Sequence, residues 1–219
     1  MKARIAPFDP KFVNSKGHLF DSEIGRSKGT HLSQVIKYIR IKLGELRLTD
    51  NNAFAMFGFI FELLVEKALA AYLSFNQEDM IEPGEQECDG IFMTPDRFNP
   101  FLGKQGTVFE YKATWKSIGG SKTKPSIFID GVRENGLDTD VFQERFWYWL
   151  MQLMEYCRAL GTRRGTIVAL FLNGDYTFRE PYGGPQFLCI VFEFTEAEIE
   201  ANHSMVVREA REMEREDAA

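Results

Sequence analysis

The chain has 219 residues, a formal net charge of -6 and 44% hydrophobic residues. A chain of this length and apolar content can bury one sizeable core, so we expect a single domain over residues 1–219. The acidic balance excludes a protein coated in basic surface, but it is compatible with a local basic groove or with an acidic metal site.

No stretch approaches the roughly 20 consecutive apolar residues that span a bilayer, and the N-terminus lacks the apolar region of a signal peptide. We therefore expect a cytoplasmic protein with no membrane partner. The three cysteines, Cys88, Cys157 and Cys189, are widely spaced in apolar contexts. This pattern favours buried, reduced thiols over a zinc or iron–sulfur site.

The first half of the chain predicts an irregular arm, two helices and two strands. Residues 1–30 lack apolar periodicity and form the arm. Apolar residues at helical spacing predict helices over 31–46 and 50–75. Strands are predicted at 88–93 and 107–115, with a turn-rich segment between them.

The second half begins with a long polar segment, 116–140, which is functional or disordered by its length. A helix is predicted over 141–161, because its apolar residues keep helical spacing and Gly161 supplies a stop signal. Strands at 165–173 and 186–194 form a pair, and residues 195–219 form a charged amphipathic helix. The order of elements predicts an α/β fold with a small central mixed sheet flanked by helices.

The segment 107–115 contains two opposite charges on one face of a strand. Glu110 and Lys112 are two residues apart, so their side chains point the same way. Taken alone, they could be a salt pair on an exposed strand. If the strand at 88–93 pairs with this one, Asp89 can meet Glu110 across the ladder. Two close carboxylates favour a cation between them, and Mg²⁺ prefers such hard oxygen ligands.

Two predicted helices carry polar residues that fit the same site. Glu62 closes the segment Gly58–Glu62, "GFIFE", and lies among apolar neighbours. Gln152 and Tyr156 are four residues apart in "QLMEY" and therefore share a helical face. An ordinary helix boundary face, or a Glu at the edge of an apolar stripe, would give the same pattern.

Together these motifs resemble the PD-(D/E)xK nuclease superfamily, in particular its RecB-type and lambda-exonuclease-like (YqaJ-like) viral exonuclease branch. The resemblance covers roughly residues 50–195 and implies a restriction-endonuclease-like core. We assign the acidic strand position to Asp89 and not to Asp96, because Asp96 lies in the predicted turn.

The resemblance implies a role for each residue of the motif. Asp89, Glu110 and the main-chain carbonyl of Tyr111 would bind Mg²⁺ or Mn²⁺, with Glu62 completing or supporting the cluster. Lys112 would position the attacking water. Gln152 would organise the acidic site and Tyr156 would lie near the nucleic acid. The chain lacks the four suitably placed cysteines of iron–sulfur relatives, so no iron–sulfur cluster is expected.

Basic residues in two predicted irregular segments are candidate contacts to DNA phosphates. They are Arg26, Lys28, Lys122, Lys124 and Arg133. The histidines, His18, His31 and His203, lie at no metal-ligand spacing from one another or from a cysteine, so histidine-based metal chemistry is not expected.

These observations favour a metal-dependent DNA exonuclease of phage-type recombination, repair or genome processing. An endonuclease of the same fold, restriction-like or acting on junctions or in repair, is one alternative. An inactive DNA-binding or assembly subunit on a nuclease fold is another. The resemblance also implies a homo-oligomeric ring, a single-strand annealing protein or other recombination partner, and, for a viral protein, the cytoplasm of a bacterial host.

Overall fold

The computed structural model describes residues 27–45, 79–114, 139–171 and 186–218, with the backbone alone for 139–145 and 186–188. The helix predicted over 50–75 and most of the polar segment 116–140 lie outside these ranges. In chain order the described elements are β1 (Thr30–His31), α1 (Leu32–Lys42), β2 (Gln86–Cys88), β3 (Ile91–Met93), β4 (Arg97–Asn99), β5 (Thr107–Thr114), α4 (Thr139–Ala159), β6 (Arg164–Phe171), β7 (Gln186–Glu193) and α5 (Glu196–Asp217).

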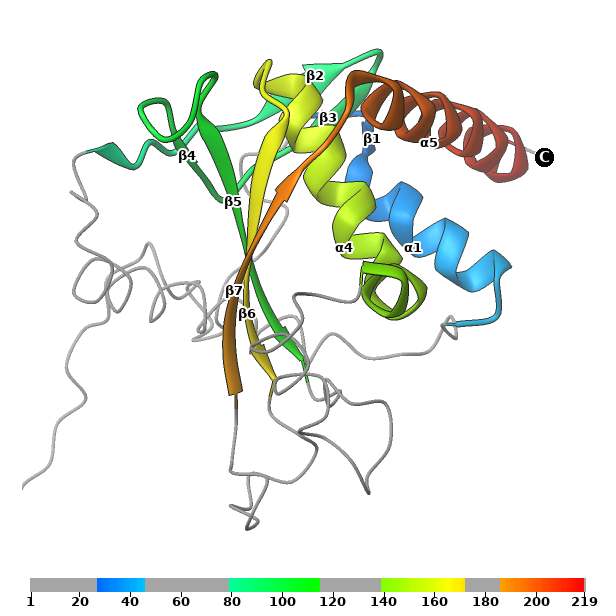
Figure 1. Cartoon of the computed structure of the whole chain (residues 1–219). Helices are drawn as coiled ribbons and strands as arrows, with labels where there is room; N and C mark the ends of the chain where they lie inside the picture. Colours follow the sequence, from blue (N-terminus) through cyan, green and yellow to red (C-terminus); the bar gives the residue numbers. More distant parts are fainter. Residues whose placement is uncertain (1–26, 46–78, 115–138, 172–185, 219) are drawn as a thin grey trace, which may run out of the picture.

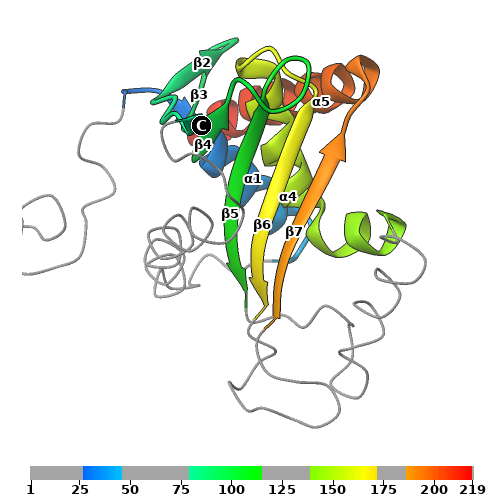
Figure 2. The same ribbon diagram turned by 60° about the vertical axis from the view of Figure 1, so that its left-hand side comes forward.

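The strands form two sheets. The larger has the order β4-β5-β6-β7, in which β5 and β6 run parallel and the two outer pairs run antiparallel. The smaller has the order β1-β3-β2. Helices α1, α4 and α5 gather on one side of the larger sheet, with α4 lying along it (Figures 1 and 2). The predicted α/β fold with a small mixed sheet and flanking helices is confirmed, as is the pairing of the last two strands.

The main core lies between the larger sheet and α4. The predicted apolar stripe of α4 is buried, since Phe146, Leu150, Leu153 and Cys157 have exposed fractions of 6% or less. On the sheet side the stripe meets residues such as Ile167. The helix bends at Phe146, whose φ of -128° and ψ of 25° are not helical.

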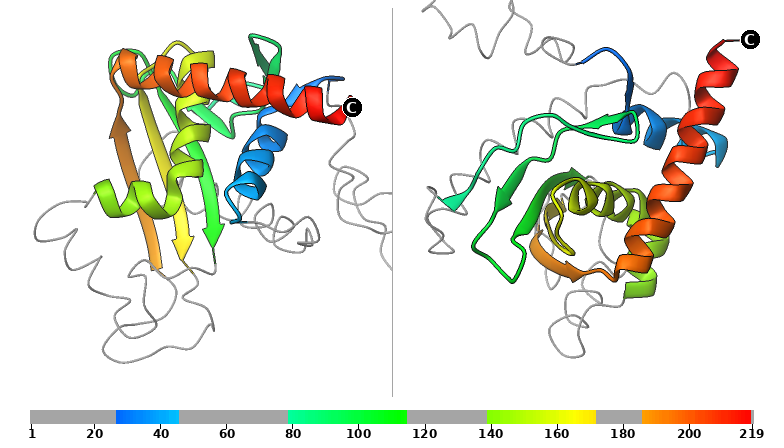
Figure 3. Two further views of the ribbon diagram at one scale, coloured as in Figure 1. Left: turned by 90° about the vertical axis from the view of Figure 1, so that its right-hand side faces the viewer. Right: turned by 90° about the horizontal axis from the view of Figure 1, so that it is seen from above.

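Helix α5 crosses over α4 and α1 (Figure 3). Thr195 caps its N-terminus, where the Thr195 hydroxyl accepts a hydrogen bond from the Glu198 amide. Such a cap contributes about 1 kcal/mol. Further along α5, Glu209 and Glu212 both pair with Lys42 of α1. Both ends of α5 are thus held by polar contacts.

Three expectations about local structure are wrong. Residues 88–93 are not one strand, because positive φ angles at Asp89 and Gly90 turn the chain between β2 and β3. The segment before β5 is not all turn, since it contains β4. Cys189 is exposed and not buried as expected.

Gly165, on β6, allows α4 to approach the sheet closely. A Cβ atom built at this position would lie 2.6 Å from Cγ and Cδ2 of Leu153. Gly165→Ala is therefore expected to lower the free energy of unfolding by about 1–3 kcal/mol, the usual range for overpacking a dense core. Urea denaturation measures this change. Leu153→Ala should lower the free energy of unfolding by less in the Gly165→Ala background than in the wild type, because the new methyl group fills part of the cavity that Leu153→Ala leaves. Equal losses in the two backgrounds would contradict the packing argument.

No helix among the described residues combines the length and the apolar character required to cross a membrane.

Candidate active site

The antiparallel pairing of β4 with β5 brings two carboxyl groups together. The register joins Arg97 to Phe109 and Phe98 to Val108. One step further along the same register, Asp96 lies opposite Glu110, on the same face of the sheet. The Glu110 side chain is close enough to Asp96 to influence the pKa of its carboxyl group. The two acids therefore meet at the end of a two-stranded ladder.

At the next residue of β5, the Asp96 side chain accepts the hydrogen bond that a neighbouring strand would otherwise accept. Its Oδ2 accepts a hydrogen bond of 2.7 Å from the main-chain N–H of Tyr111. The N–H and C=O groups of one strand residue point to the same edge of the strand. The main-chain carbonyl of Tyr111 therefore points toward the edge at which Asp96 lies.

Lys112 connects this pair of acids to α4. The Lys112 ammonium group donates to Oε1 of Glu110, and it also donates to Oε1 of Gln152 over 3.0 Å. The shared strand face predicted for Glu110 and Lys112 is observed, and it faces α4. Glu110 is buried, with 1% of its side chain exposed, whereas 19% of the Lys112 side chain is exposed. The Lys112 ammonium group thus lies between the buried Glu110 carboxylate and the solvent.

Gln152 is held in place by the residue one helical turn further on. Its Nε2 donates to the hydroxyl of Tyr156 over 2.6 Å, while its Oε1 accepts from Lys112. Tyr156 is only 5% exposed and packs in the main core. Tyr156 therefore orients Gln152 in this structure, and a contact between Tyr156 and nucleic acid stays a prediction.

The chemistry of the cluster is suited to a divalent metal ion. Desolvation raises the pKa of the Asp96 carboxyl group, and the neighbouring Lys112 ammonium group opposes this shift. A raised carboxyl pKa means that the folded protein disfavours the carboxylate form at this position. Two carboxylates and a main-chain carbonyl are hard oxygen donors, the ligand type that Mg²⁺ and Mn²⁺ prefer. The donor set thus fits a divalent cation.

The expectation that Asp89 meets Glu110 across a ladder is wrong. Asp89 lies in the turn between β2 and β3, in the smaller sheet, whereas Glu110 lies in the larger one. The Asp89 carboxylate pairs with His203 and Arg158. Asp96, which was predicted to lie in a turn, occupies the position expected for Asp89. The dipeptide Pro95–Asp96 was the signal in the sequence that could have identified it.

The remaining predicted site residues lie mostly outside the described ranges. Glu62, Arg26, Lys122, Lys124 and Arg133 are among them, and their roles stay predictions. Lys28 is described and exposed, just before β1.

Among known proteins, no family model matches the chain, and no curated protein matches it. Several solved structures are similar to it. One is a phage-related exonuclease from Haemophilus somnus 129PT, with a TM-score of 0.49 and 13% identity over 83% of this chain and 79% of that chain. Another is an alkaline exonuclease, LHK-Exo, from Laribacter hongkongensis, with a TM-score of 0.44 and 14% identity over 87% of this chain and 93% of that chain. LHK-Exo is also similar in its complex with dAMP.

Proposed function

We propose that this protein is a divalent-metal-dependent deoxyribonuclease, and that it acts as an exonuclease with Mg²⁺ or Mn²⁺. The observation that carries the proposal is the position of Asp96 opposite Glu110, which pairs with Lys112, at the end of the β4–β5 ladder. Two carboxylates and a lysine on one face of the sheet are the groups that metal-assisted phosphodiester hydrolysis needs.

Each residue of the cluster has a role in this proposal. Asp96 and Glu110 would hold the metal, together with the main-chain carbonyl of Tyr111. A divalent metal at this position would supply Lewis-acid chemistry for the attack of water on the scissile phosphate. Lys112 orients the water and stabilises the negative charge that develops on the phosphate. Gln152 accepts a hydrogen bond from Lys112 and so fixes the position of the ammonium group.

Other residues enter the proposal from the sequence alone. Glu62 supports the metal cluster, and basic residues at 26, 28, 122, 124 and 133 contact the DNA backbone. A homo-oligomeric ring and a recombination partner such as a single-strand annealing protein also belong to this proposal. The expected role is in phage-type recombination, repair or genome processing.

Purified protein incubated with end-labelled linear and circular DNA, in Mg²⁺ or in EDTA, tests the function. We expect degradation of linear DNA in Mg²⁺, intact circular DNA, and no degradation in EDTA. Cleavage of the circle would instead indicate an endonuclease. Binding without cleavage in either condition would overturn the proposal in favour of an inactive DNA-binding subunit.

Cleavage should depend on pH through Asp96. Metal binding needs the carboxylate, and desolvation raises the pKa of Asp96 above its ordinary value. At limiting Mg²⁺, the initial rate is therefore expected to rise with pH, with a midpoint above the ordinary carboxyl pKa of about 3.9. Initial rates measured across pH at limiting and at saturating Mg²⁺ check this. The midpoint should fall as Mg²⁺ increases, and a midpoint independent of Mg²⁺ would contradict the assignment.

A further inference from the structure

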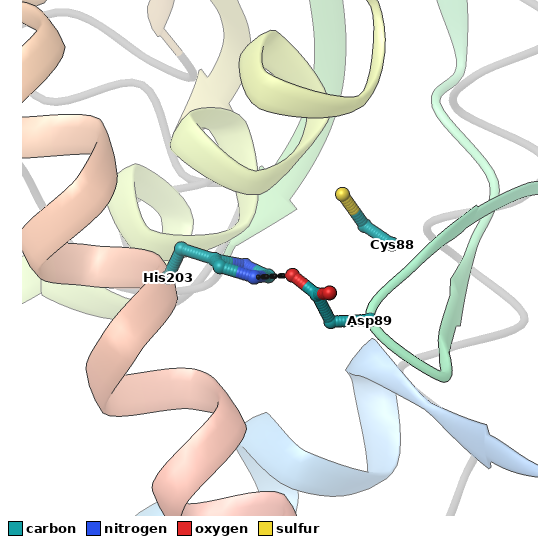
Figure 4. Close-up of side chains that lie close together, drawn as sticks. All are labelled: Cys88, Asp89 and His203. Atoms are coloured by element: carbon teal, nitrogen blue, oxygen red, sulfur yellow. Dashed lines mark hydrogen bonds and ion pairs between the residues drawn. The ribbon is translucent and has the colours of Figure 1, made fainter.

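A second group of side chains of the types that bind metal ions lies at the turn between β2 and β3. One ligand atom each from Cys88, Asp89 and His203 lie within 4.8 Å of one another. Cys88 and Asp89 come from the hairpin, and His203 comes from α5 (Figure 4). Asp89 and Gly90 have φ angles of 50° and 81°, the positive values that a tight type I′ turn requires at both central residues. The turn therefore fixes the two hairpin residues opposite His203.

His203 is oriented by a buried carboxylate on its other side. Its Nδ1 lies 2.8 Å from Oε2 of Glu155, and its Nε2 lies 2.6 Å from Oδ2 of Asp89. Glu155 is fully buried on α4, and its Oε1 accepts a hydrogen bond from Asn202 over 2.7 Å. A carboxylate that accepts from one ring nitrogen of a histidine is the usual partner of a metal-binding imidazole, because it directs the lone pair of the other nitrogen at the metal.

The ring of His203 lies between two carboxyl groups, with Nδ1 beside Glu155 and Nε2 beside Asp89. One ligand atom of Cys88 lies within 4.8 Å of ligand atoms of Asp89 and His203. A metal ion bound at this point would contact all three side chains, while Glu155 would hold the imidazole ring from its other side.

We propose that Cys88, Asp89 and His203 form a zinc site that is separate from the acidic cluster around Glu110. Binding displaces the thiol proton of Cys88, and any proton carried by Nε2 of His203, to the solvent, and one Zn²⁺ takes their place. Arg158, which pairs with Asp89 and Glu200, lies beside the site.

Zinc fits this ligand set better than the metals proposed for the acidic cluster. Thiolate and imidazole are softer ligands than carboxylate oxygens, and together they select Zn²⁺ over Mg²⁺ or Mn²⁺. Ligand atoms of one tetrahedral Zn²⁺ lie roughly 3–4 Å apart, since each is about 2.0–2.3 Å from the metal. Asp89 has 59% of its side chain exposed, so it can rotate away from His203 to open this spacing.

A bound zinc ion would join three elements of the fold. The β2–β3 turn and α5 would supply its ligands, and α4 would support it through Glu155. We therefore expect Zn²⁺ to raise the Tm of the metal-free protein, and EDTA to reverse the increase, without any added DNA or Mg²⁺.

Titration of the metal-free, full-length protein with Co²⁺ tests the site directly. Co²⁺ replaces zinc and gives a thiolate-to-cobalt charge-transfer band when a cysteine binds it. We expect one equivalent of Co²⁺ to produce this band, excess Zn²⁺ to remove it, and binding to release protons into an unbuffered solution. Absence of the band from the wild-type protein would overturn the proposal.

Matched variants identify the ligands. Cys88→Ser should abolish the band, whereas Cys189→Ser, at an exposed cysteine away from the site, should retain it. Glu110→Gln, which removes an acid of the proposed nuclease centre, should also retain the band, so the two proposals can fail independently. Glu155→Gln is expected to weaken Zn²⁺ binding about 10–100-fold, as for other partners of metal-bound histidines. A band that survives Cys88→Ser, or that is lost with Cys189→Ser, would place the metal elsewhere and refute the site.

Discussion

Asp96→Asn is expected to lower kcat for metal-dependent DNA cleavage by a factor of about 10² to 10³ or more, the range seen when a charged or hydrogen-bonding group of an active site is removed. The asparagine side chain keeps an oxygen that can accept from the Tyr111 N–H, as Asp96 does over 2.7 Å. It removes the negative charge that would help Glu110 to hold a divalent cation. Initial rates on end-labelled linear DNA, at several Mg²⁺ concentrations, measure the effect.

The stability of the same variant separates a functional role from a structural one. Because desolvation raises the pKa of Asp96, the unfolded chain binds fewer protons than the folded protein between the two pKa values. The contribution of Asp96 to the free energy of unfolding therefore falls as pH rises through that interval. Asparagine removes this penalty, so Asp96→Asn should have a Tm in EDTA at neutral pH no lower than that of the wild type. A parallel loss of Tm and activity would contradict a direct role.

Asp89→Asn is the matched control, because it makes the same chemical change at the other candidate aspartate. Asp89 contacts His203 and Arg158 and is not part of the cluster around Glu110. We expect Asp89→Asn to cleave linear DNA within a few-fold of the wild-type rate. If Asp89→Asn loses cleavage and Asp96→Asn keeps it, the site described for this protein is wrong.

Glu155→Ala is expected to cause the largest loss of stability, about 3–5 kcal/mol in the free energy of unfolding. Glu155 is fully buried, and its carboxylate contacts Asn202 and His203. Removing one partner from a buried charged network leaves the others without compensation, and this causes losses of that size. In a protein of this length the corresponding fall in Tm is about 10 °C. Chemical denaturation and calorimetry, both in EDTA, measure the two quantities.

Two comparisons test the origin of that loss. Glu200→Ala removes a half-exposed partner of Arg158 on α5 and should change stability by less than about 1 kcal/mol. Combining Glu155→Leu with His203→Leu should cost less than the sum of the single variants, with a coupling energy above about 1 kcal/mol. Additive single losses would show that Glu155 and His203 stabilise the protein independently.

The part of the site that lies within one strand or one helix could be predicted from the sequence. Strand alternation placed Glu110 and Lys112 on one face, and helical spacing placed Gln152 beside Tyr156; the hydrogen bond from Lys112 to Gln152 then joins the two elements. These relations depend on backbone periods, which any chain obeys. The apolar stripe of α4 was predictable for the same reason.

The choice of the second acid was not predictable in this way, because it depends on which strands pair. The pattern at residues 88–93 predicted a single strand containing Asp89, whereas the Asp89–Gly90 dipeptide forms a turn. An Asp–Gly pair between apolar residues is a strong turn signal. With a turn at Asp89–Gly90, the next segment, β4, is the strand that is predicted to pair with β5. That pairing places Asp96 opposite Glu110. The proximity of Cys88 to His203 had no comparable signal, since tertiary packing alone brings them together.

The two clusters differ in how much of the chain must be folded before each exists. Asp96, Glu110 and Lys112 lie within one hairpin, and Gln152 follows 40 residues after Lys112. The contact between Asp89 and His203 closes a separation of 114 residues. Longer loops carry a larger entropic penalty before their contacts form, so the acidic cluster should assemble early and the docking of α5 on the hairpin late. Detachment of α5 would then be a partial opening that leaves the acids and the lysine in place.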